Sequence, residues 1–581
     1  MSIASTNSPF FDKIRKAVLF IGVAAALFYL FYWMFLMSGK YSLSADEFGT
    51  ISAYSSRGPF VVMSHYPAPK NHIFFNLVNS IYPFGNSYAL PRARIISMLA
   101  VLATVICAVR FLARRNLYFA CFVFLGFWLV NPETHLMLMQ ARGYGLMGLF
   151  AVLSFIFSSR YLDSGEERPF IALCICTVLG IYTVPTYAVF GASILGCTWL
   201  AQPNRRMFRA AVIAMLVTIA LYLPVIAQVV KSFHKYSESM GKTFESFAGI
   251  QLFLHLYALP TIGEKSINVW YVFGGLALGV ALLWKEKSAF KFALCAFVTC
   301  VVFFVYCLWQ QTLPMRTAAF MGAPVVFLMV FLCDKAVLQR IPWKLPLLLL
   351  EIGVCVLLLG GVMEHYKTDN FLPFEDWSLA RKTTEFLTGV DGEIFIDDSY
   401  KNENAKNFRF VVDRRTKVHE IKDASRPNGV LVGAMRTWKS SDPEFQPFSD
   451  HGWNFIRLPG LHKRIIINIP STLLKDQSVV SVVGKMDDAS LPITMEGMET
   501  MLQPSEKPYV AGFQFSNAAE GFFQVESWNG SAWKPLAKAQ YINVSDYILV
   551  HSSDKPLKLR FLPRTLANSP ALVQVWIFQS K

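Results

Sequence analysis

Long apolar stretches fill most of the first two-thirds of this 581-residue chain and constrain its fold more than any other feature. A helix needs about 20 consecutive apolar residues to cross a bilayer. Such stretches lie near residues 17–37, 95–112, 117–131, 143–159, 169–183, 185–201, 210–230, 268–284, 290–309, 317–333 and 345–363. Charged residues make up only 16% of the chain, where a soluble domain carries about 25%. The sequence therefore predicts a polytopic α-helical membrane protein with about 11 transmembrane helices.

The basic residues between these stretches predict the orientation. Short cytoplasmic loops of membrane proteins carry an excess of Lys and Arg. Here the clusters are Lys13/Arg15/Lys16, Arg110/Arg114/Arg115, Arg205/Arg206/Arg209, Lys285/Lys287/Lys291 and Lys335/Arg340/Lys344. With eleven spans all of them fall on one side. If residues 169–201 formed one long helix, the last three clusters would fall on the other side, so the charges favour two short spans that meet near Pro185.

The amino-terminal segment predicts a retained span, because the apolar run is too long for a signal peptide and lacks a clean cleavage site. The amino terminus is then cytoplasmic. A net charge of +15 does not indicate nucleic-acid binding, since the cations lie between apolar stretches. All ten cysteines lie within or beside apolar stretches, none after residue 355, so we predict no disulfide framework.

The opposite side receives a long loop (38–94), a short connection (132–142), a third loop (231–267) and the carboxyl-terminal tail. The first domain is therefore predicted to span 1–363. Short apolar runs such as 393–397 and 429–433 are typical of buried strands, and residues 376–388 are typical of a helix. Together they predict a small α/β unit at 364–464. Short strands and turn signals such as Asn529-Gly530 predict a β-sandwich at 465–581.

Two adjacent carboxylates, Asp46 and Glu47, directly follow the first span. A base held at the membrane surface can reach a lipid-anchored substrate whose phosphate lies at headgroup depth. The alternative is an acidic cap on a helix outside the membrane. Further along the same loop lie His65, Tyr66, Lys70 and His72, beside an amphipathic stretch that suits the interface. Lys70 and His72 could bind a phosphate, although ordinary interfacial solvation explains them equally well.

Two arginines stand at outer ends of apolar stretches, against the trend of the other cations. They are Arg142 and Arg316. Each could extend to the headgroups or hold an anionic ligand. Glu133, His135 and Tyr144 lie beside Arg142 and are candidates for binding substrate. Glu351, inside the last stretch, more readily makes a structural hydrogen bond to another helix.

The sequence contains no Walker A motif, no dinucleotide fingerprint and no metalloprotease or serine-hydrolase motif. The cytoplasmic loops are too short to hold a nucleotide. A group donor would therefore be carried by a lipid.

Three segments together resemble the C-type glycosyltransferase (GT-C) fold, in particular bacterial membrane transferases related to aminoarabinose transferase and protein O-mannosyltransferases. These segments are Asp46-Glu47 after the first span, residues 71–77 with 84–87 and 90–97, and residues 140–145. They occur in matching order over roughly residues 40–160, and the remaining spans agree in number and spacing. The tail beyond about residue 364 lies outside the resemblance.

The resemblance implies an inverting transfer of a sugar, hexose or pentose, from a polyprenyl phosphate to a cell-envelope glycan, a lipid-linked glycan or a protein. It implies that Asp46 is the catalytic base and that Glu47 assists it or binds the acceptor. Lys70, His72, Arg142 and Arg316 would hold the lipid phosphate. A divalent cation near Asp46, Glu47 and His72 is an option that the mechanism does not require. The chain would lie in the bacterial inner membrane with its carboxyl-terminal domain in the periplasm.

Two other functions fit the sequence. One is a transporter or flippase of a lipid-linked sugar, although the polar signals lie in outer loops and no internal repeat is evident. The other is a non-catalytic assembly protein that binds envelope glycan through its tail. Assays of the purified protein separate the three functions. Sugar transfer indicates a glycosyltransferase, movement of the lipid-linked sugar across the bilayer without transfer indicates a flippase, and the absence of both activities indicates an assembly protein.

Overall fold

The computed structural model describes residues 9–40, 43, 45–67, 71–81, 92–130, 137–239, 247–254, 257, 268–311, 313 and 315–338, and short segments between 381 and 579. The chain divides into two compact units. One comprises residues 1–40 with 46–365, and the other residues 41–45 with 366–581. The predicted span at 345–363, with Glu351, lies outside the described residues.

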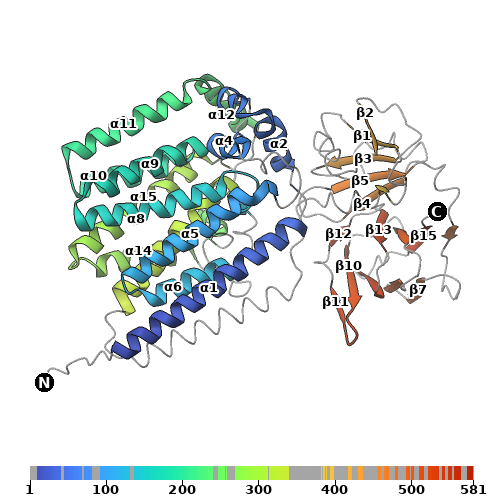
Figure 1. The fold of residues 1–581 in the computed structure, drawn as a ribbon. Helices are drawn as coiled ribbons and strands as arrows, with labels where there is room; N and C mark the ends of the chain where they lie inside the picture. The colour runs from blue at the N-terminus through green and yellow to red at the C-terminus, as the bar shows by residue number, and fades with distance from the viewer. Residues whose placement is uncertain are drawn as a thin grey trace. The chain divides into compact units, whose positions relative to one another are not determined.

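The first unit is built from helices (Figure 1). They are α1 (Pro9–Lys40), α2 (Ala45–Ala53), α3 (Pro59–Ser64), α4 (Ile73–Ile81), α5 (Ile95–Arg114), α6 (Tyr118–Val130), α8 (Tyr144–Ser164), α9 (Glu167–Thr183), α10 (Tyr187–Ala201), α11 (Arg205–Tyr222), α12 (Ile226–Ser239), α13 (Phe247–Phe253), α14 (Val269–Leu282), α15 (Lys287–Gln310), α16 (Met315–Ala318) and α17 (Gly322–Leu332). Short 3₁₀ turns lie at Ser55–Arg57, Arg92–Arg94 and Ala319–Met321, and a π-helical turn, η5, at Cys333–Val337.

Several of these helices are membrane-spanning in character. Within the described residues, four continuous helical stretches are long and apolar enough to cross a bilayer: Arg92–Arg114, Tyr144–Ser164, Lys287–Gln310 and Arg316–Val337. Shorter apolar helices lie at Phe20–Phe35, Tyr118–Trp128, Tyr187–Ala201 and Val269–Leu282. The prediction of a largely helical membrane protein is confirmed, whereas the number of eleven spans stays a prediction.

Residues 169–201 form two helices and not one. Helix α9 ends at Thr183 and α10 begins at Tyr187. Val184 is extended, and its N–H donates to the carbonyl of Gly180. Pro185 then cannot continue the helix, because it has no N–H and disfavours helical geometry at the residue before it. The two helices pack against each other, as the charge pattern favoured.

The predicted span at 210–230 is not straight. Helix α11 ends at Tyr222, and α12 leaves it at an angle of 81°. Pro224 lies in the break, where its missing N–H and its ring interrupt the helical hydrogen bonds. The predicted span near 210–230 therefore contains a sharp bend, and its crossing of the membrane stays a prediction.

Helix α8 forms the core of the first unit. It is apolar on all sides, and such a helix is buried on all sides. Phe155 stacks on Phe190 of α10 and packs against Phe327 of α17, with ring centroids 5.6 and 6.4 Å apart. Since α8 has 21 residues, its two ends lie about 31 Å apart. One end therefore carries the Arg142 loop and the other the α8–α9 turn.

Ion pairs show that the basic clusters found in the sequence gather at the end of the bundle that carries the α8–α9 turn. Asp163, in the last turn of α8, bonds to Arg115 after α5 and to Ser288 at the start of α15. Arg206 of α11 pairs with Glu167 at 3.1 Å, and Lys335 of η5 pairs with Glu286 at 3.2 Å. The segments that carry four of the five clusters therefore meet at the end of the bundle opposite Arg142.

The second unit contains two sheets. The first has the strand order β2-β1-β3-β5-β4-β13-β9-β15-β6, and the second has the order β11-β10-β14-β8-β7 with β12 beside β10. The strands are β1 (Glu393–Asp397), β2 (Lys417–Ile421), β3 (Val430–Met435), β4 (Asn454–Leu458), β5 (Arg464–Ile469), β6 (Ser478–Ser481), β7 (Ile493–Glu496), β8 (Glu499–Leu502), β9 (Tyr509–Phe515), β10 (Gly521–Trp528), β11 (Trp533–Pro535), β12 (Gln540–Ile542), β13 (Tyr547–His551), β14 (Leu557–Pro563) and β15 (Leu572–Gln579).

The sheets carry features of both predicted tail units. Strands β2, β1 and β3 are parallel, as an α/β unit requires, and Asn529-Gly530 lies in the turn between the antiparallel β10 and β11. The parallel strands nevertheless continue through β5 and β4 into β13 and β9 within one sheet. A boundary at residue 464 stays a prediction, because hydrogen-bonded strands join the two sides of it.

Two glycines of α8 offer a test of how tightly the Arg142 loop is packed. A Cβ at Gly145 would lie 2.7 Å from the carbonyl oxygen of Leu138 and 2.9 Å from that of Ser97, both backbone atoms, whereas one at Gly148 would lie 4.0 Å from the Leu138 side chain. We expect Gly145→Ala to destabilise the protein by about 1–3 kcal/mol. Gly148→Ala is the control and should leave stability unchanged or slightly higher. Thermal unfolding in detergent checks this, and equal midpoints for both variants would contradict the packing.

Candidate active site

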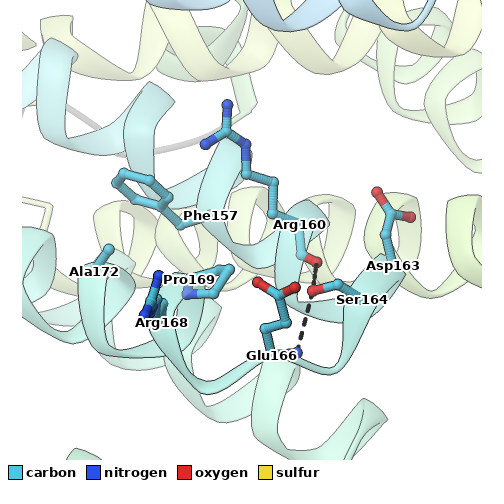
Figure 2. A pocket seen from close by; sticks show the side chains of 8 residues that line it. All are labelled: Phe157, Arg160, Asp163, Ser164, Glu166, Arg168, Pro169 and Ala172. Atoms are coloured by element: carbon cyan, nitrogen blue, oxygen red, sulfur yellow. Dashed lines mark hydrogen bonds between the residues drawn. The ribbon is translucent and has the colours of Figure 1, made fainter.

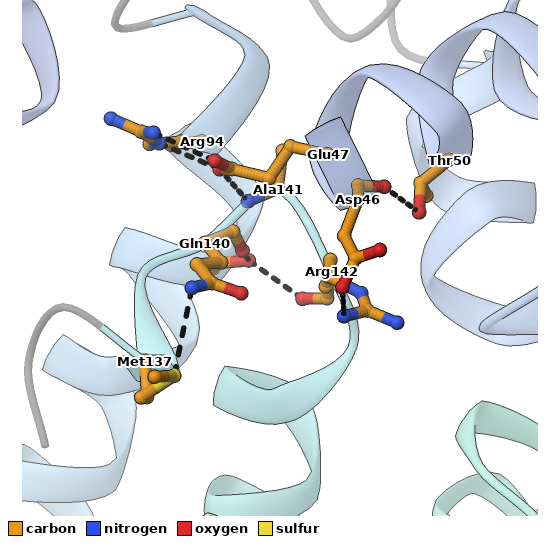
Figure 3. A network of polar contacts seen from close by, with 9 residues as sticks. Asp46, Glu47, Thr50, Arg94, Met137, Gln140, Ala141 and Arg142 are labelled. Atoms are coloured by element: carbon orange, nitrogen blue, oxygen red, sulfur yellow. Dashed lines mark hydrogen bonds and ion pairs between the residues drawn. The ribbon is translucent and has the colours of Figure 1, made fainter. Parts of the chain in front are cut away.

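Helix α2 brings two carboxylates to the same end of the bundle as the Arg142 loop. Asp46 and Glu47 occupy its first turn, where the helix dipole favours negative charge. The Thr50 hydroxyl donates to the Asp46 backbone carbonyl at 2.8 Å. Both carboxylates contact arginines of other segments, Asp46 towards Arg142 and Glu47 towards Arg94 (Figure 3). They therefore do more than cap the helix.

Glu47 joins α2 to two other segments. Arg94 Nε and Nη2 donate to its two oxygens at 2.7 and 2.8 Å, and the backbone N–H of Ala141 donates to Oε1 at 2.6 Å. Glu47 is 1% exposed and Arg94 4% exposed. Two charges are buried at this depth only when they are paired with good geometry. The contact fixes the residue after Asp46 to the residue before Arg142, so Glu47 is placed to position other groups.

Asp46 lies between two arginines. Its Oδ2 atom accepts from Arg142 Nη1 at 3.0 Å and forms an ion pair with Arg316, whose Nη1 lies 2.8 Å away. The three side chains come from α2, from the loop before α8 and from α16, segments that are separated by long stretches of sequence. Two guanidinium groups that converge on one oxygen form a site in which an anion is held by charge-assisted hydrogen bonds.

The loop that carries Arg142 is fixed through its backbone. The Ser97 hydroxyl contacts the carbonyl oxygens of Gln140 and Arg142 at 2.7 and 2.9 Å. The N–H of Gly143 donates to His72 Nδ1 at 2.8 Å. A side chain at Gly143 would meet Thr183 at 2.3 Å and His72 at 2.9 Å, so this close approach requires glycine. Arg142 itself is 2% exposed.

The hydrogen bonds of His72 define its tautomer. Nδ1 accepts from Gly143, and burial and the nearby Arg142 hold the pKa of the imidazole well below its ordinary value of 6.5. The ring is then neutral at physiological pH, and its proton lies on Nε2. Nε2 is 3.2 Å from Arg142 Nη2, which is also a donor. Two hydrogen-bond donors thus face each other, and an anion with acceptor oxygens placed near both would satisfy them.

Arg142 carries a second unsatisfied group. Its Nε atom is buried and has no hydrogen-bond partner among the described residues. Buried N–H groups are almost always paired, so an exception calls for an explanation. The Nε atom and the donor contact with His72 both indicate that the site is completed by a ligand with acceptor oxygens.

Aromatic rings line this cluster. The Tyr144 ring meets the His72 ring edge-on at 4.9 Å, and the Arg142 guanidinium lies 5.0 Å from the centre of Tyr144. Tyr66 is buried, and burial raises the pKa of its hydroxyl, while the charge of Arg142 acts in the opposite direction. His65 is exposed, and its ring lies 6.5 Å from that of Tyr54. The structure thus places Tyr144 directly at Arg142, and Tyr66 within reach of the charge of Arg142.

Three predicted residues lie outside the described part of the chain, and one residue of the cluster was not predicted. The three are Lys70, Glu133 and His135. The unpredicted residue is Arg94. It stands at the outer end of an apolar stretch, as Arg142 and Arg316 do, so the same signal could have identified it. What the sequence does not show is that its partner is Glu47.

The residues suggested for a cation are not arranged as a ligand set. Glu47 is engaged by Arg94 and Ala141, and His72 by Gly143. The part of the chain that the structure describes holds no group of three His, Cys, Asp or Glu side chains placed to share a metal ion.

A cavity of about 510 Å³ lies at the opposite end of α8 (Figure 2). Arg160, Asp163, Glu166 and Arg168 line it, together with apolar atoms of α8 and α9. Its charges are mixed, and the four charged residues are all exposed. It lacks the buried, convergent donors of the Asp46 cluster, which we take as the candidate active site.

Comparison with known proteins gives distant likenesses only. No family model and no curated protein matches the sequence. The structure is similar to ArnT from Cupriavidus metallidurans in the apo state, with 11% identity and a TM-score of 0.44, and to the same protein bound to undecaprenyl phosphate, with 12% identity and a TM-score of 0.47. Each covers 78% of this chain and 98% of that chain.

The arabinosyltransferase EmbB from Mycobacterium smegmatis is also similar. The identity is 13% and the TM-score 0.32, over 96% of this chain and 64% of EmbB. ArnT and EmbB are thus among the solved structures to which this chain is similar, at identities under 25% and TM-scores under 0.5. Likenesses this distant assign no activity, so the function is inferred from the site.

The Glu47 contact predicts a large difference between two acid-to-amide substitutions. Glu47→Gln leaves the buried Arg94 without its counter-charge, and breaking such a pair costs about 3–5 kcal/mol. Glu167→Gln removes an exposed partner of Arg206, and such surface pairs contribute about 0–1 kcal/mol. Unfolding of both variants in detergent checks this. A Glu47 variant as stable as the Glu167 variant would show that the Glu47–Arg94 pair does not hold α2 in place.

Proposed function

We propose that this protein is a membrane glycosyltransferase that moves a sugar from a polyprenyl phosphate to an acceptor outside the cytoplasm. The observation that carries the proposal is the convergence of Arg142 and Arg316 on Asp46. A cationic site for the leaving phosphate and a carboxylate that can act as a base then lie side by side. Transfer of a sugar from a phosphate needs both groups.

The unsatisfied donors favour a phosphate over other anions. Arg142 Nε and the facing Arg142 Nη2 and His72 Nε2 atoms offer several N–H groups in a small space. A phosphate group brings more than one acceptor oxygen and takes up bidentate contacts with guanidinium groups. Because His72 is neutral, it contributes a hydrogen bond without adding charge.

The position of the site favours a lipid as carrier. Arg142 comes two residues before the apolar helix α8, and Arg316 begins the apolar stretch Arg316–Val337. Arginines at the ends of spanning helices lie at the depth of lipid headgroups. A phosphate bound by both would therefore lie where the phosphate of a membrane-anchored polyprenyl chain lies. The sequence has no nucleotide-binding motif, in keeping with a donor of this kind.

The reaction proceeds as a single displacement. The acceptor hydroxyl gives its proton to the Asp46 carboxylate, and its oxygen forms a bond to the anomeric carbon of the sugar. The bond from that carbon to the phosphate oxygen breaks, and its electron pair stays on the polyprenyl phosphate. Arg142, Arg316 and the His72 N–H stabilise the charge that develops there. Attack opposite the leaving group inverts the configuration.

The proposed orientation follows from the two ends of the bundle. The end with the basic clusters faces the cytoplasm under the positive-inside rule, and the Asp46 end faces outwards. In a bacterial inner membrane the outer side is the periplasm, and eleven spans would carry the carboxyl-terminal domain to that side. The acceptor, whether envelope glycan, lipid-linked glycan or protein, approaches from that side.

Three variants and one control test the proposal. Asp46→Asn should lower transfer by about 10²–10⁴-fold, since it removes the base. Arg142→Gln and Arg316→Gln should weaken donor binding by about 10–100-fold, because each removes a charge-assisted contact with the phosphate. Arg206→Gln, at the opposite end, should change neither.

The measurement is transfer by the purified protein in lipid nanodiscs, with synthetic polyprenyl-phosphate sugars as donors. Mass spectrometry of the lipid-linked sugar that co-purifies with the protein identifies which donor sugar to use in this assay. Near-normal transfer by Asp46→Asn would show that Asp46 is not the catalytic base. Movement of the lipid-linked sugar across the bilayer without any transfer would favour the flippase instead.

A further inference from the structure

We propose that Asp46 also serves as an internal anion, which holds Arg142 and Arg316 together until the donor's phosphate displaces it. This rests on the proposed function and adds an order of events to it. The base is withheld while the donor site is empty and is released when the phosphate binds. The catalytic base and the donor phosphate thus compete for one pair of arginines.

Asp46 occupies the position that a ligand oxygen would take. Its Oδ2 atom lies 3.0 Å from Nη1 of Arg142 and 2.8 Å from Nη1 of Arg316, paired with both charges. An oxygen of a bound phosphate would accept from guanidinium groups in the same way. Asp46 thus fills the place between Arg142 and Arg316 that the phosphate needs.

In that position Asp46 is a poor base. A general base has to direct a lone pair at the proton of the acceptor hydroxyl. The lone pairs of Oδ2 are directed at two guanidinium N–H groups instead. While this contact lasts, Oδ2 cannot take up a proton. Two adjacent positive charges also make the whole carboxylate a weaker base, so release from at least one arginine favours the transfer.

The donors that Asp46 leaves unsatisfied explain why a phosphate would win the competition. With Asp46 in place, Arg142 Nε has no partner among the described residues, and Arg142 Nη2 still faces His72 Nε2. A buried donor without a partner costs about 1–3 kcal/mol. A phosphate with several acceptor oxygens can satisfy groups that the shared carboxylate oxygen leaves unsatisfied. The exchange is therefore favourable once the ligand is present.

Glu47 allows Asp46 to move without disrupting the site. As the next residue in the chain, it is held by Arg94 and by the N–H of Ala141. These contacts keep the backbone of α2 beside the Arg142 loop. The release of Asp46 then requires rotation of its side chain and a loosening of the first turn of α2, but no larger movement, which leaves the carboxylate close to the bound sugar.

Binding of a short-chain prenyl monophosphate to the full-length protein in detergent tests this, with inorganic phosphate compared in parallel. Asp46→Asn keeps the shape of the side chain and removes the competing charge. It should bind the prenyl phosphate at least about fivefold more tightly than the wild type, the lower end of typical coupling between sites. Asp163→Asn is the matched control, since it also removes a carboxylate paired with an arginine, at the opposite end, and should leave the affinity unchanged.

The outcomes separate the two proposals. Equal or weaker binding by Asp46→Asn, with clear binding by the wild type, overturns the displacement and leaves the proposed function standing. Absence of prenyl phosphate binding by both proteins contradicts the proposed function and this inference with it. If inorganic phosphate shows the same gain, the displacement holds and the arginines recognise the phosphate alone; a gain confined to the prenyl phosphate shows that the lipid chain contributes.

A second measurement avoids the variant, in case Asp46→Asn unfolds. Hydrogen exchange of the wild-type protein should change when the prenyl phosphate is added. Peptides that cover Ala45–Ala53 should exchange faster, because Asp46 loses at least one of the arginine contacts that tie the first turn of α2 to the Arg142 loop, while that loop should become more protected. Slower exchange in both segments would show that Asp46 stays bound to the arginines.

Discussion

A buried ion pair holds the candidate site together. Glu47 and Arg94 are both shielded from water, and charges in that environment are tolerated only when each finds its partner in good geometry. The pair therefore strongly favours one arrangement of α2 against the start of α5. The N–H of Ala141 adds the third segment, so that the neighbours of Glu47 and Ala141, namely Asp46 and Arg142, are brought into contact.

The chemistry follows from what this arrangement leaves unsatisfied. Glu47 and Arg94 satisfy each other, whereas Arg142 keeps an N–H without a partner among the described residues and faces a second donor on His72. Stable cores rarely contain such groups, and functional sites more often do. The difference between the two neighbouring carboxylates is thus a difference of role. We propose that Glu47 positions the site and that Asp46 stands where a ligand and a proton would exchange.

Much of the fold could be predicted from the sequence because membrane helices are specified locally. Apolar length and flanking charge placed α5, α8 and α15, and Pro185 correctly marked the break between α9 and α10. Pro224 gave the same signal and was overlooked, because the apolar composition continues through the bend. Strands β1 and β3 were also predicted closely, since each is a short, largely apolar run bounded by turn signals.

The site could be predicted only in part, for a physical reason. Asp46, His72, Arg142 and Arg316 stood out because each is a polar group beside an apolar stretch, where it is costly. Which carboxylate meets which arginine depends on contacts between distant segments, such as Glu47 with Arg94, and no local pattern encodes them. The tautomer of His72 likewise depends on the N–H of Gly143, a backbone group that a sequence does not display.

The central claim is that Arg142, Arg316 and His72 bind the phosphate of a lipid. A cryo-electron microscopy structure of the protein in nanodiscs with a polyprenyl phosphate tests it most directly. The account predicts phosphate density within hydrogen-bond distance of these three side chains, with the Asp46 carboxylate turned away from at least one arginine. Phosphate density at another place, with Asp46 still bound to both arginines, would contradict it.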